Sequence, residues 1–417
     1  MKQVIENRRA KAAACWNLHN EVVLIGAGSP IGIPGGLDQT FEYRVHPEYR
    51  WLTEEHRPGS VLAYDPQSGW TRFAPAVTEA ERIWDGVTLE PEGPYLDELG
   101  AWLQARSNLD QLHLGAGSTG SERESELREQ LTHARRPKDE LEIAKMAQAT
   151  KATLSGHQEA TRFIRPGVTE RQIQIEIEAA FCRGGATRPG YSSIVGTGTN
   201  SAVFHFTPGS RIVKEEDVVL VDAGAEVDGY VIDVTRTYSA NGKFTPQQQA
   251  IYDIVLDAEE RAVNRCRTGM EWLHVHLTAA LDMAQGLVDL GILKGTATSA
   301  VESDAMAMFF PHGIGHMVGL GVRDASGTLP GRTGDARAAG VRVRCDFPLA
   351  EGYIMTVEPG IYFIPALLND QERRRRFVDH VDWNLVDEFM GMGGIRIEDN
   401  VLVTGGDPVN LTAEIPK

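Results

Sequence analysis

The chain has 417 residues, a formal net charge of −17, 42% hydrophobic residues and 24% charged residues. This length exceeds what one ordinary hydrophobic core organises, so we expect two domains. The negative charge argues against nucleic acid or an anionic membrane as a partner, because both would repel the protein. The chain start lacks the apolar run of a signal peptide, and no segment approaches the roughly 20 apolar residues of a membrane span. The four cysteines are far apart without CxxC spacing, which indicates reduced thiols and a cytoplasmic protein.

Residues 1–135 have strand and turn signals of their own and are predicted to form a smaller α/β domain. Glycines follow short apolar runs at residues 21–32 and 112–120, and the second run ends in a literal GxGxxG. A dinucleotide-binding loop also needs a following helix and an acidic residue about 20 positions further on. The second loop lies late in the domain and leads into a charged segment, so we expect a simple strand-to-helix turn and no nucleotide.

The charged, proline-containing segment 135–139 is the predicted domain boundary. A segment with helical periodicity follows this boundary and ends at an Arg-Pro-Gly sequence. A second helix then begins at Thr169, with Gln172 in the position of a capping box, and ends at a Gly-Gly pair. The same order of helix, Arg-x-Gly break, helix and strands recurs from residue 245 onward. We infer two similar α+β halves that face each other across a cleft.

A predicted hairpin lies between these two helical regions. The apolar run from Val218 to Val221 indicates a buried strand, and Asp228-Gly229 is a turn signal. In the register of a two-residue turn, Asp222 faces Thr235, and Asp233 is diagonal to Asp222 on the same face. Two crowded carboxylates repel and are costly to desolvate unless a cation lies between them. The alternative is a solvated outer face with two unrelated aspartates.

The second half adds residues of metal-binding type. His312 and His316 lie in FFPHGIGHMVG, where the glycines argue against a helix and therefore against an HExxH zinc site. Glu358 and Glu398 lie in apolar, strand-like segments, where an unpartnered carboxylate is costly. Ion pairs or a packed core histidine would explain two or three of these positions, but five in one domain favour metal. One histidine with four carboxylates suits two divalent ions, Mn²⁺ best, with Co²⁺ or Zn²⁺ as alternatives.

From about residue 136 to the C-terminus the chain resembles the pita-bread metallopeptidases, which include methionine aminopeptidase, aminopeptidase P and prolidase (Xaa-Pro dipeptidase). The resemblance rests on the segments DAG, DVTRT, HGIGH, EPGIY and GIRIED. It implies a set of five metal ligands: Asp222, Asp233, His316, Glu358 and Glu398. Creatinase and other non-peptidase members lack the complete set, so the resemblance implies a metal-dependent enzyme.

The resemblance also implies the fold class, α+β, with a pita-bread catalytic domain over residues 136–417 and a smaller α/β domain over residues 1–135. The N-terminal part is similar, more loosely, to the creatinase-like N-terminal domain of aminopeptidase P and prolidase. The segment RIWDG, Arg82 to Gly86, carries the best local match.

The activity that the resemblance implies is hydrolysis of the bond before a proline, by a hydroxide shared between two metal ions. Glu358 would take up the proton and pass it to the leaving nitrogen. Arg396 and Tyr362 resemble groups that orient ligands and relay protons. His205, in IVGTGTNSAVFHF, would bind the substrate near the scissile carbonyl. His312 lies near the site in the family, or serves packing alone.

The segment between Glu358 and Glu398 resembles the insert of prolidases, so we favour a dipeptidase over an aminopeptidase P that accepts longer peptides. A dipeptidase must bind the free carboxylate after the proline, and a guanidinium fork does this well. The resemblance points to Arg373 or Arg374 for this role, although a run of four arginines also suits a solvated face. It implies a homodimer acting on small peptides. Phosphotriester hydrolysis and a catalytically silent binding module are the alternatives.

One position departs from the family pattern. Prolidase and aminopeptidase P usually have V-H-D seven residues after the ligand histidine, where this chain has Val322-Arg323-Asp324. Arginine keeps a hydrogen-bond donor but is permanently charged, so it cannot shuttle a proton. We expect Arg323 to contribute electrostatics or a substrate contact, unless it turns away into a salt bridge.

Overall fold

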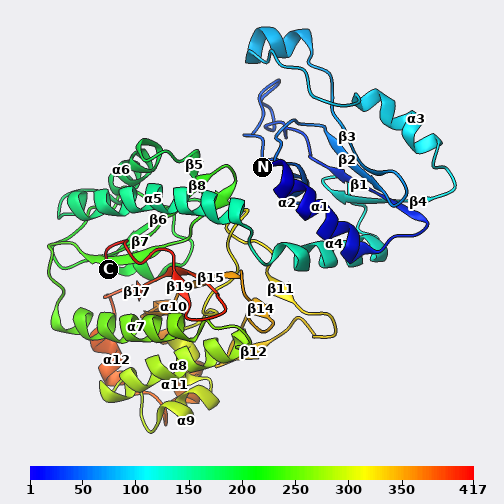
Figure 1. Cartoon of the computed structure of the whole chain (residues 1–417). Coiled ribbons are helices and arrows are strands. Elements are labelled where there is room, and N and C mark those ends of the chain that lie inside the picture. The colour runs from blue at the N-terminus through cyan, green and yellow to red at the C-terminus, as the bar shows by residue number, and fades with distance from the viewer. The chain divides into compact units, whose positions relative to one another are not determined.

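The computed structural model describes all residues from Met1 to Lys417. The chain divides into two compact units, Met1–Arg135 and Arg136–Lys417, which are called here the N-terminal and C-terminal units (Figure 1). None of the helices combines the length and the hydrophobicity that crossing a membrane requires.

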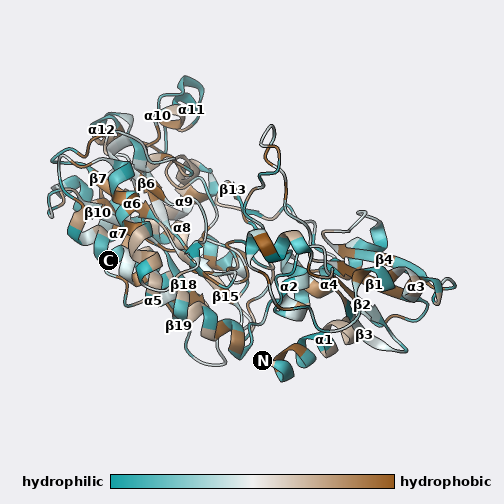
Figure 2. Ribbon diagram, turned by 90° about the horizontal axis from the view of Figure 1, so that it is seen from above, coloured by the Kyte–Doolittle hydropathy of each residue, from teal (hydrophilic) through white to brown (hydrophobic).

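The N-terminal unit is built on a four-stranded sheet in the order β3-β2-β1-β4. Its strands are β1 (Glu21–Gly26), β2 (Val61–Asp65), β3 (Gly69–Phe73) and β4 (Asp110–Gly115). The central strand β1 is mainly hydrophobic and largely buried, and it pairs antiparallel with β2 and parallel with β4 (Figure 2). The helical segments of the unit are α1 (Lys2–Trp16), α2 (Pro47–Thr53), η1 (Glu81–Asp85), η2 (Leu96–Glu98), α3 (Leu99–Gln104) and α4 (Glu122–Arg135).

The GxGxxG segment forms the turn from β4 into α4, as the sequence predicts. Glu124, in the first turn of α4, accepts hydrogen bonds from the backbone N–H groups of Thr119 (2.7 Å) and Gly120 (3.0 Å). A phosphate at a helix N-terminus would need such N–H groups for itself. The carboxylate of Glu124 therefore occupies the backbone N–H groups that a bound phosphate would need.

Two helix pairs enclose the strands of the C-terminal unit. The first pair is α5 (Glu140–Phe163) and α6 (Glu170–Arg183), and the second is α7 (Pro246–Arg265) and α8 (Trp272–Asp289). Figure 1 shows α5 and α6 on one side of the strands and α7 and α8 on the other. Thr169 caps α6 with the predicted capping box. The repeated order of elements expected from the sequence is therefore confirmed.

The strands of the C-terminal unit are short and form several small sheets. In the first half they are β5 (Arg188–Pro189), β6 (Ile194–Thr197), β7 (Val218–Asp222), β8 (Ala225–Val227), β9 (Tyr230–Val231) and β10 (Thr235–Ser239). In the second half they are β11 (Gly327–Thr328), β12 (Arg337–Ala338), β13 (Val341–Arg342), β14 (Cys345–Asp346), β15 (Ile354–Val357), β16 (Gly360–Tyr362), β17 (Gly394–Arg396), β18 (Asp399–Leu402) and β19 (Val409–Asn410). The remaining short helices are η3 (Gly198–Ala202), α9 (Ala297–Glu302), η4 (Ala305–Met308), α10 (Pro365–Leu368), α11 (Gln371–Arg376) and α12 (Trp383–Phe389).

The hairpin formed by β7 to β10 has the predicted register. Asp222 is the pairing partner of Thr235, and Val227 faces Tyr230 across the turn. Both turn residues have positive φ, 52° at Asp228 and 86° at Gly229, as the common two-residue hairpin turn requires. The hairpin is almost entirely buried, so its two aspartates do not lie on a solvated face.

Candidate metal centre

Strands of both halves of the C-terminal unit, and the segments that adjoin them, carry the five predicted ligands. Asp222 ends β7, and Asp233 lies between β9 and β10. Glu358 follows β15 and Glu398 precedes β18, and these two strands pair antiparallel. His316 lies in an extended, glycine-rich segment outside any helix, as predicted. The sheet pairing therefore gathers residues that are far apart in the sequence.

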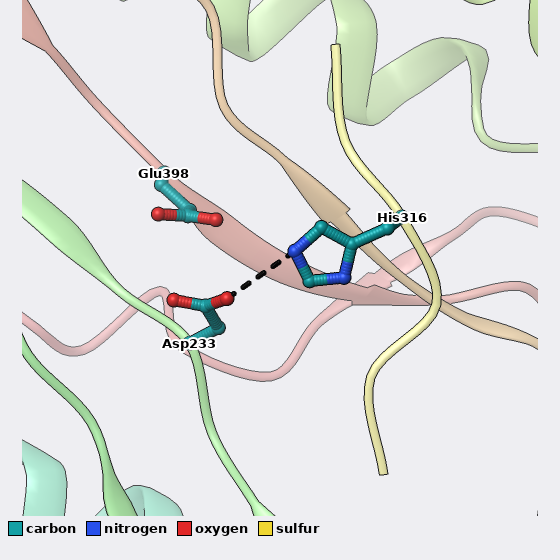
Figure 3. A group of neighbouring side chains, drawn as sticks. All are labelled: Asp233, His316 and Glu398. Atoms are coloured by element: carbon teal, nitrogen blue, oxygen red, sulfur yellow. Dashed lines mark ion pairs between the residues drawn. The ribbon is translucent and has the colours of Figure 1, made fainter. Parts of the chain in front are cut away.

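Three of these residues form a compact group. Asp233, His316 and Glu398 each offer a ligand atom, and these atoms all lie within 4.8 Å of one another (Figure 3). The Nε2 atom of His316 is 3.4 Å from Asp233 Oδ2 and 3.8 Å from Glu358 Oε1. Three of the four predicted carboxylates are thus grouped with His316.

The hydrogen bonds of His316 indicate what this group can hold. Its Nδ1 is 2.9 Å from the carbonyl oxygen of Met317, which can only accept, so Nδ1 carries the proton. The Nε2 lone pair then faces carboxylate oxygens, which is unfavourable unless a cation lies between them. A backbone carbonyl that fixes the tautomer in this way is typical of a metal-binding histidine.

Asp222 belongs to the same buried cluster. Its Oδ2 accepts a hydrogen bond from Arg396 Nη2 at 2.6 Å, whereas Oδ1 is buried without a hydrogen-bond partner. Burial raises the pKa of Asp222 to about 6, with Asp233 acting in the same direction and Arg396 opposing it. Burial and the neighbouring carboxylates also raise the pKa of Glu398 well above its usual range. Divalent cations would relieve this crowding, so the residues fit the expected metal ions.

A chain of hydrogen bonds leads from Asp222 to His312. Arg396 Nη1 donates to the hydroxyl of Tyr362 at 3.0 Å, and that hydroxyl is 2.8 Å from His312 Nε2. Burial lowers the pKa of His312 to about 3, so its imidazole is neutral. Since Nδ1 faces the carbonyl oxygen of Gly313 at 2.9 Å and carries the proton, Nε2 accepts from Tyr362. His312 is therefore oriented by polar contacts as well as packed.

A cavity of about 300 Å³ opens beside this cluster. Besides the five predicted ligands, its wall includes aromatic, histidine, proline, glycine and arginine residues: Phe204, His205, Pro311, His312, Gly313, Gly315, Arg323, Arg344 and Arg396. The structure thus brings His205, Arg323 and Arg396 to the same space as the ligand set. Tyr362 lies behind this wall, fully buried.

Arg373 and Arg374 do not line this cavity. Arg374 donates to the carbonyl oxygen of Leu368 at 2.6 Å, pairs with Asp387 and lies over the ring of Trp383. Arg373 is exposed on the same short helix, α11. Arg374 is thus held by neighbouring residues, and neither arginine lies at the cavity, where the predicted carboxylate-binding role would place it.

Some residues of the site were not singled out from the sequence. Thr235 Oγ1 donates to Glu398 Oε2 at 2.7 Å and accepts from Arg396 Nε at 3.0 Å. The predicted pairing of Thr235 with Asp222 could have indicated that Thr235 lies beside the predicted ligands. Arg344 had no such signal, because it lies among other arginines in an ordinary alternating segment.

Strands enclosed by two similar helix pairs, with one histidine and four carboxylates beside one cavity, define a metal-dependent hydrolase of the pita-bread fold. Residues 144–405, more than half of the chain, match the model of metallopeptidase family M24, and the chain belongs to this family. The resemblance inferred from the motifs is therefore confirmed, and the protein is a metallopeptidase with divalent metal ions.

Curated relatives cover most of the chain. It is 30% identical over 397 residues to "Probable Xaa-Pro aminopeptidase pepP" of Botryotinia fuckeliana, covering 91% of this chain and 86% of that protein. It is 31% identical over 401 residues to "Probable Xaa-Pro aminopeptidase PEPP" of Phaeosphaeria nodorum, covering 89% and 84%.

Solved structures of similar sequence have the same architecture. Proline aminopeptidase P II from Yersinia pestis has a TM-score of 0.82 at 29% identity, over 100% of this chain and 97% of that chain. Aminopeptidase P from E. coli, solved with the inhibitor Pro-Leu, has a TM-score of 0.82 at 28% identity, over 100% and 96%. These matches confirm the predicted fold class, an α+β pita-bread domain preceded by a smaller domain.

Proposed function

We propose that the protein is an Xaa-Pro aminopeptidase, which releases the first residue of peptides whose second residue is proline. The observation that carries the metal-dependent chemistry is the Nε2 lone pair of His316 facing the carboxylates of Asp233 and Glu358. The names of the relatives and the likeness to aminopeptidase P structures support the choice of substrate.

This proposal replaces the dipeptidase favoured from the sequence. That preference rested on the insert between Glu358 and Glu398 and on a carboxylate-binding arginine within it. The insert's Arg374 is engaged by Asp387 and Leu368, and the relatives described above are named aminopeptidases. The alternative from the sequence analysis, an aminopeptidase acting on longer peptides, is better supported.

We propose that Asp222, Asp233, His316, Glu358 and Glu398 hold two divalent ions, with Mn²⁺ favoured by the oxygen-rich donor set. When bound, such ions supply a Lewis acid for the scissile carbonyl and lower the pKa of water. The same resemblance and composition lead us to propose a cytoplasmic homodimer.

The protein's own groups have separable roles in this proposal. The side chain of Glu358 is 16% exposed, against 8% for Asp233 and 13% for Asp222, so it is the carboxylate most accessible from the cavity. Glu358 would accept a proton and return it to the leaving nitrogen. His205, on the cavity wall, would hydrogen-bond the substrate, while Arg396 and Tyr362 hold His312 in one orientation.

The test is release of alanine from Ala-Pro-Ala, with Ala-Ala-Ala as the control, by protein loaded in turn with Mn²⁺, Co²⁺ or Zn²⁺. We expect cleavage of the proline peptide alone, and its loss after chelation. Cleavage of Ala-Pro but not of Ala-Pro-Ala would contradict the proposal and restore the dipeptidase. Full metal occupancy without peptide cleavage would favour a binding module, or phosphotriester hydrolysis if a nitrophenyl phosphotriester is turned over.

A further inference from the structure

The loop that carries His205 is held at both of its ends by one buried carboxylate. This loop, residues 197–209, is called here the cavity loop; it begins at the end of β6 and places His205 on the cavity wall. Glu170, the first residue of α6, has no exposed surface. Its Oε1 accepts from the backbone N–H of Thr197 at 3.0 Å, and its Oε2 accepts from that of Gly209 at 3.4 Å. One side chain of α6 thus fixes where the loop begins and where it ends.

Two further donors complete the surroundings of the Glu170 carboxylate. Thr197 Oγ1 and Asn200 Nδ2 both donate to Glu170 Oε1, at 2.8 Å each. The hydrogen bonds of Asp217 raise the pKa of Arg211, and the charge of Glu170 acts in the same direction. An ionised carboxylate is costly to bury unless hydrogen bonds compensate it. All four donors to Glu170 belong to the cavity loop, so the buried charge is compensated only when the loop is in this place.

The cavity loop is also seated against the second half of the C-terminal unit. Ser201 Oγ accepts from the backbone N–H of Gly394 at 2.7 Å and donates to the carbonyl oxygen of Gly198 at 2.6 Å. A side chain at Gly393 would collide with that same carbonyl oxygen, so the two segments are in direct contact. Gly394 begins β17, the strand that ends at Arg396. The loop therefore joins α6 of the first half to a strand of the site in the second half.

The side chain of His205 has no contacts that would fix it independently of this loop. It is exposed, and its imidazole makes no hydrogen bond within the protein. The neighbouring Phe204, in contrast, lies edge-on to His312 and to Tyr362, with ring centroids 5.3 Å and 4.8 Å apart. The position of His205 therefore depends on the backbone of the cavity loop.

We propose that Glu170 is a positioning residue for substrate binding, whose buried carboxylate holds the cavity loop and thereby places His205 at the substrate. The inference rests on the proposed function, in which His205 hydrogen-bonds the substrate. Glu170 does not line the cavity and forms no hydrogen bond or ion pair with the five predicted metal ligands. Loss of its charge should therefore weaken substrate binding more than it slows the chemical step, and should leave the metal ions in place.

The experiment uses the metal-loaded, full-length protein and the variant Glu170→Gln. This change keeps the shape of the side chain, removes the charge and turns an N–H group toward donors of the loop. We expect kcat/KM on Ala-Pro-Ala to fall about tenfold to a hundredfold, mainly through a higher KM, at unchanged metal content. Amide hydrogen exchange of the cavity loop should become faster, and this measurement does not depend on turnover.

Glu124→Gln is the matched control. Glu124 is likewise buried in the first turn of a helix and accepts from the backbone N–H groups of Thr119 and Gly120, but its loop belongs to the N-terminal unit. We expect KM and the hydrogen exchange of the cavity loop to be unchanged in this variant. Asn200→Ala is a milder second variant, which serves if Glu170→Gln does not fold. It removes one of the four hydrogen bonds to Glu170 and should raise KM about twofold to tenfold.

A double-mutant cycle with His205→Ala distinguishes positioning from a general structural role. The two single variants and their combination are measured on Ala-Pro-Ala. If Glu170 acts through His205, Glu170→Gln should have little further effect on KM once the imidazole is absent. If the two residues act independently, their effects on kcat/KM multiply.

The outcomes separate this inference from the proposed function. Absence of all Xaa-Pro cleavage by the parent protein would overturn the proposed function, and unchanged hydrogen exchange in Glu170→Gln would overturn the anchoring of the loop. With an active parent, the positioning role alone is overturned by an unchanged KM in Glu170→Gln and Asn200→Ala, by an equal rise of KM in Glu124→Gln, by loss of metal from Glu170→Gln, or by multiplicative effects in the cycle.

Discussion

Thr235 and Glu398 join the two halves of the C-terminal unit at the candidate metal centre. The backbone N–H of Glu398 donates to the carbonyl oxygen of Thr235 at 3.0 Å, and Thr235 Oγ1 donates to Glu398 Oε2 at 2.7 Å. The same hydroxyl accepts from Arg396 at 3.0 Å. A hairpin residue of the first half therefore orients two site residues of the second half. Such supporting hydrogen bonds fix the direction of a metal ligand.

Asp233→Asn should remove one or both metal ions and abolish most activity, because it deletes a ligand charge and keeps the shape. Elemental analysis and peptide turnover measure the two effects. The control is Asp228→Asn on the same hairpin. The side chain of Asp228 is 56% exposed, and asparagine tolerates the left-handed backbone conformation of this position. Full metal occupancy with normal turnover in Asp233→Asn would show that Asp233 is not a ligand.

Tyr362→Phe should lower kcat with little change in KM, because His312 loses its donor and Arg396 loses an acceptor. Loss of a supporting contact of this kind typically costs about 10–100-fold. Steady-state kinetics check the split between kcat and KM, and metal content is measured alongside. Tyr353→Phe is the control, since Tyr353 packs against Phe347 in the same unit. An unchanged kcat would remove the hydroxyl from the mechanism.

We expect the free energy of unfolding to fall in mild acid because of His157. It is fully buried, its Nδ1 is 3.0 Å from the Tyr238 hydroxyl and its Nε2 is 3.0 Å from the Ala223 carbonyl oxygen. Burial lowers its pKa from 6.5 to about 3, so the unfolded chain takes up the proton first. The stabilisation is therefore complete above pH 6.5 and is lost as pH falls toward 3, at about 1.4 kcal/mol per pH unit.

The measurement for His157 is the free energy of unfolding of metal-free protein between pH 7.5 and pH 5. We expect the His157→Gln variant, although less stable at pH 7.5, to have a clearly shallower dependence on pH than the parent. Parallel curves for the two proteins would contradict the assignment of this dependence to His157.

Gly156→Ala tests the packing of the first helix pair. A Cβ atom at Gly156 on α5 would lie 2.2 Å from Phe181 Cε1 on α6, so the helices or the ring must move. We expect a net loss of about 1–3 kcal/mol by chemical denaturation, despite the better helix propensity of alanine. Gly100→Ala is a control of opposite sign, because Gly100 is helical and has nothing within 4 Å of its Cβ position. A stabilised Gly156→Ala variant would show that this close approach is not present.

The sequence was informative wherever a local pattern has one structural solution. The turn at Asp228-Gly229 and the period of two along the strands predicted that Asp222 pairs with Thr235, and the structure has this register. The capping box at Thr169 predicted the start of α6 to the residue. These features depend on contacts between near neighbours in the chain, so the order of residues alone determines them.

The tertiary structure decided which charged groups face the cavity. Arg344 and Arg374 are both arginines in polar surroundings, and the sequence analysis chose Arg373 or Arg374 on the resemblance of one insert. The pairing of β11 with β14 brings Arg344 to the cavity, whereas Asp387 and Leu368 hold Arg374 away from its wall. A long, flexible side chain takes its partner from whatever the fold places nearby, and no local pattern encodes that neighbour. The sequence by itself therefore determined the family, the fold class and the candidate ligands, while only the packed strands decided which of the arginines line the cavity.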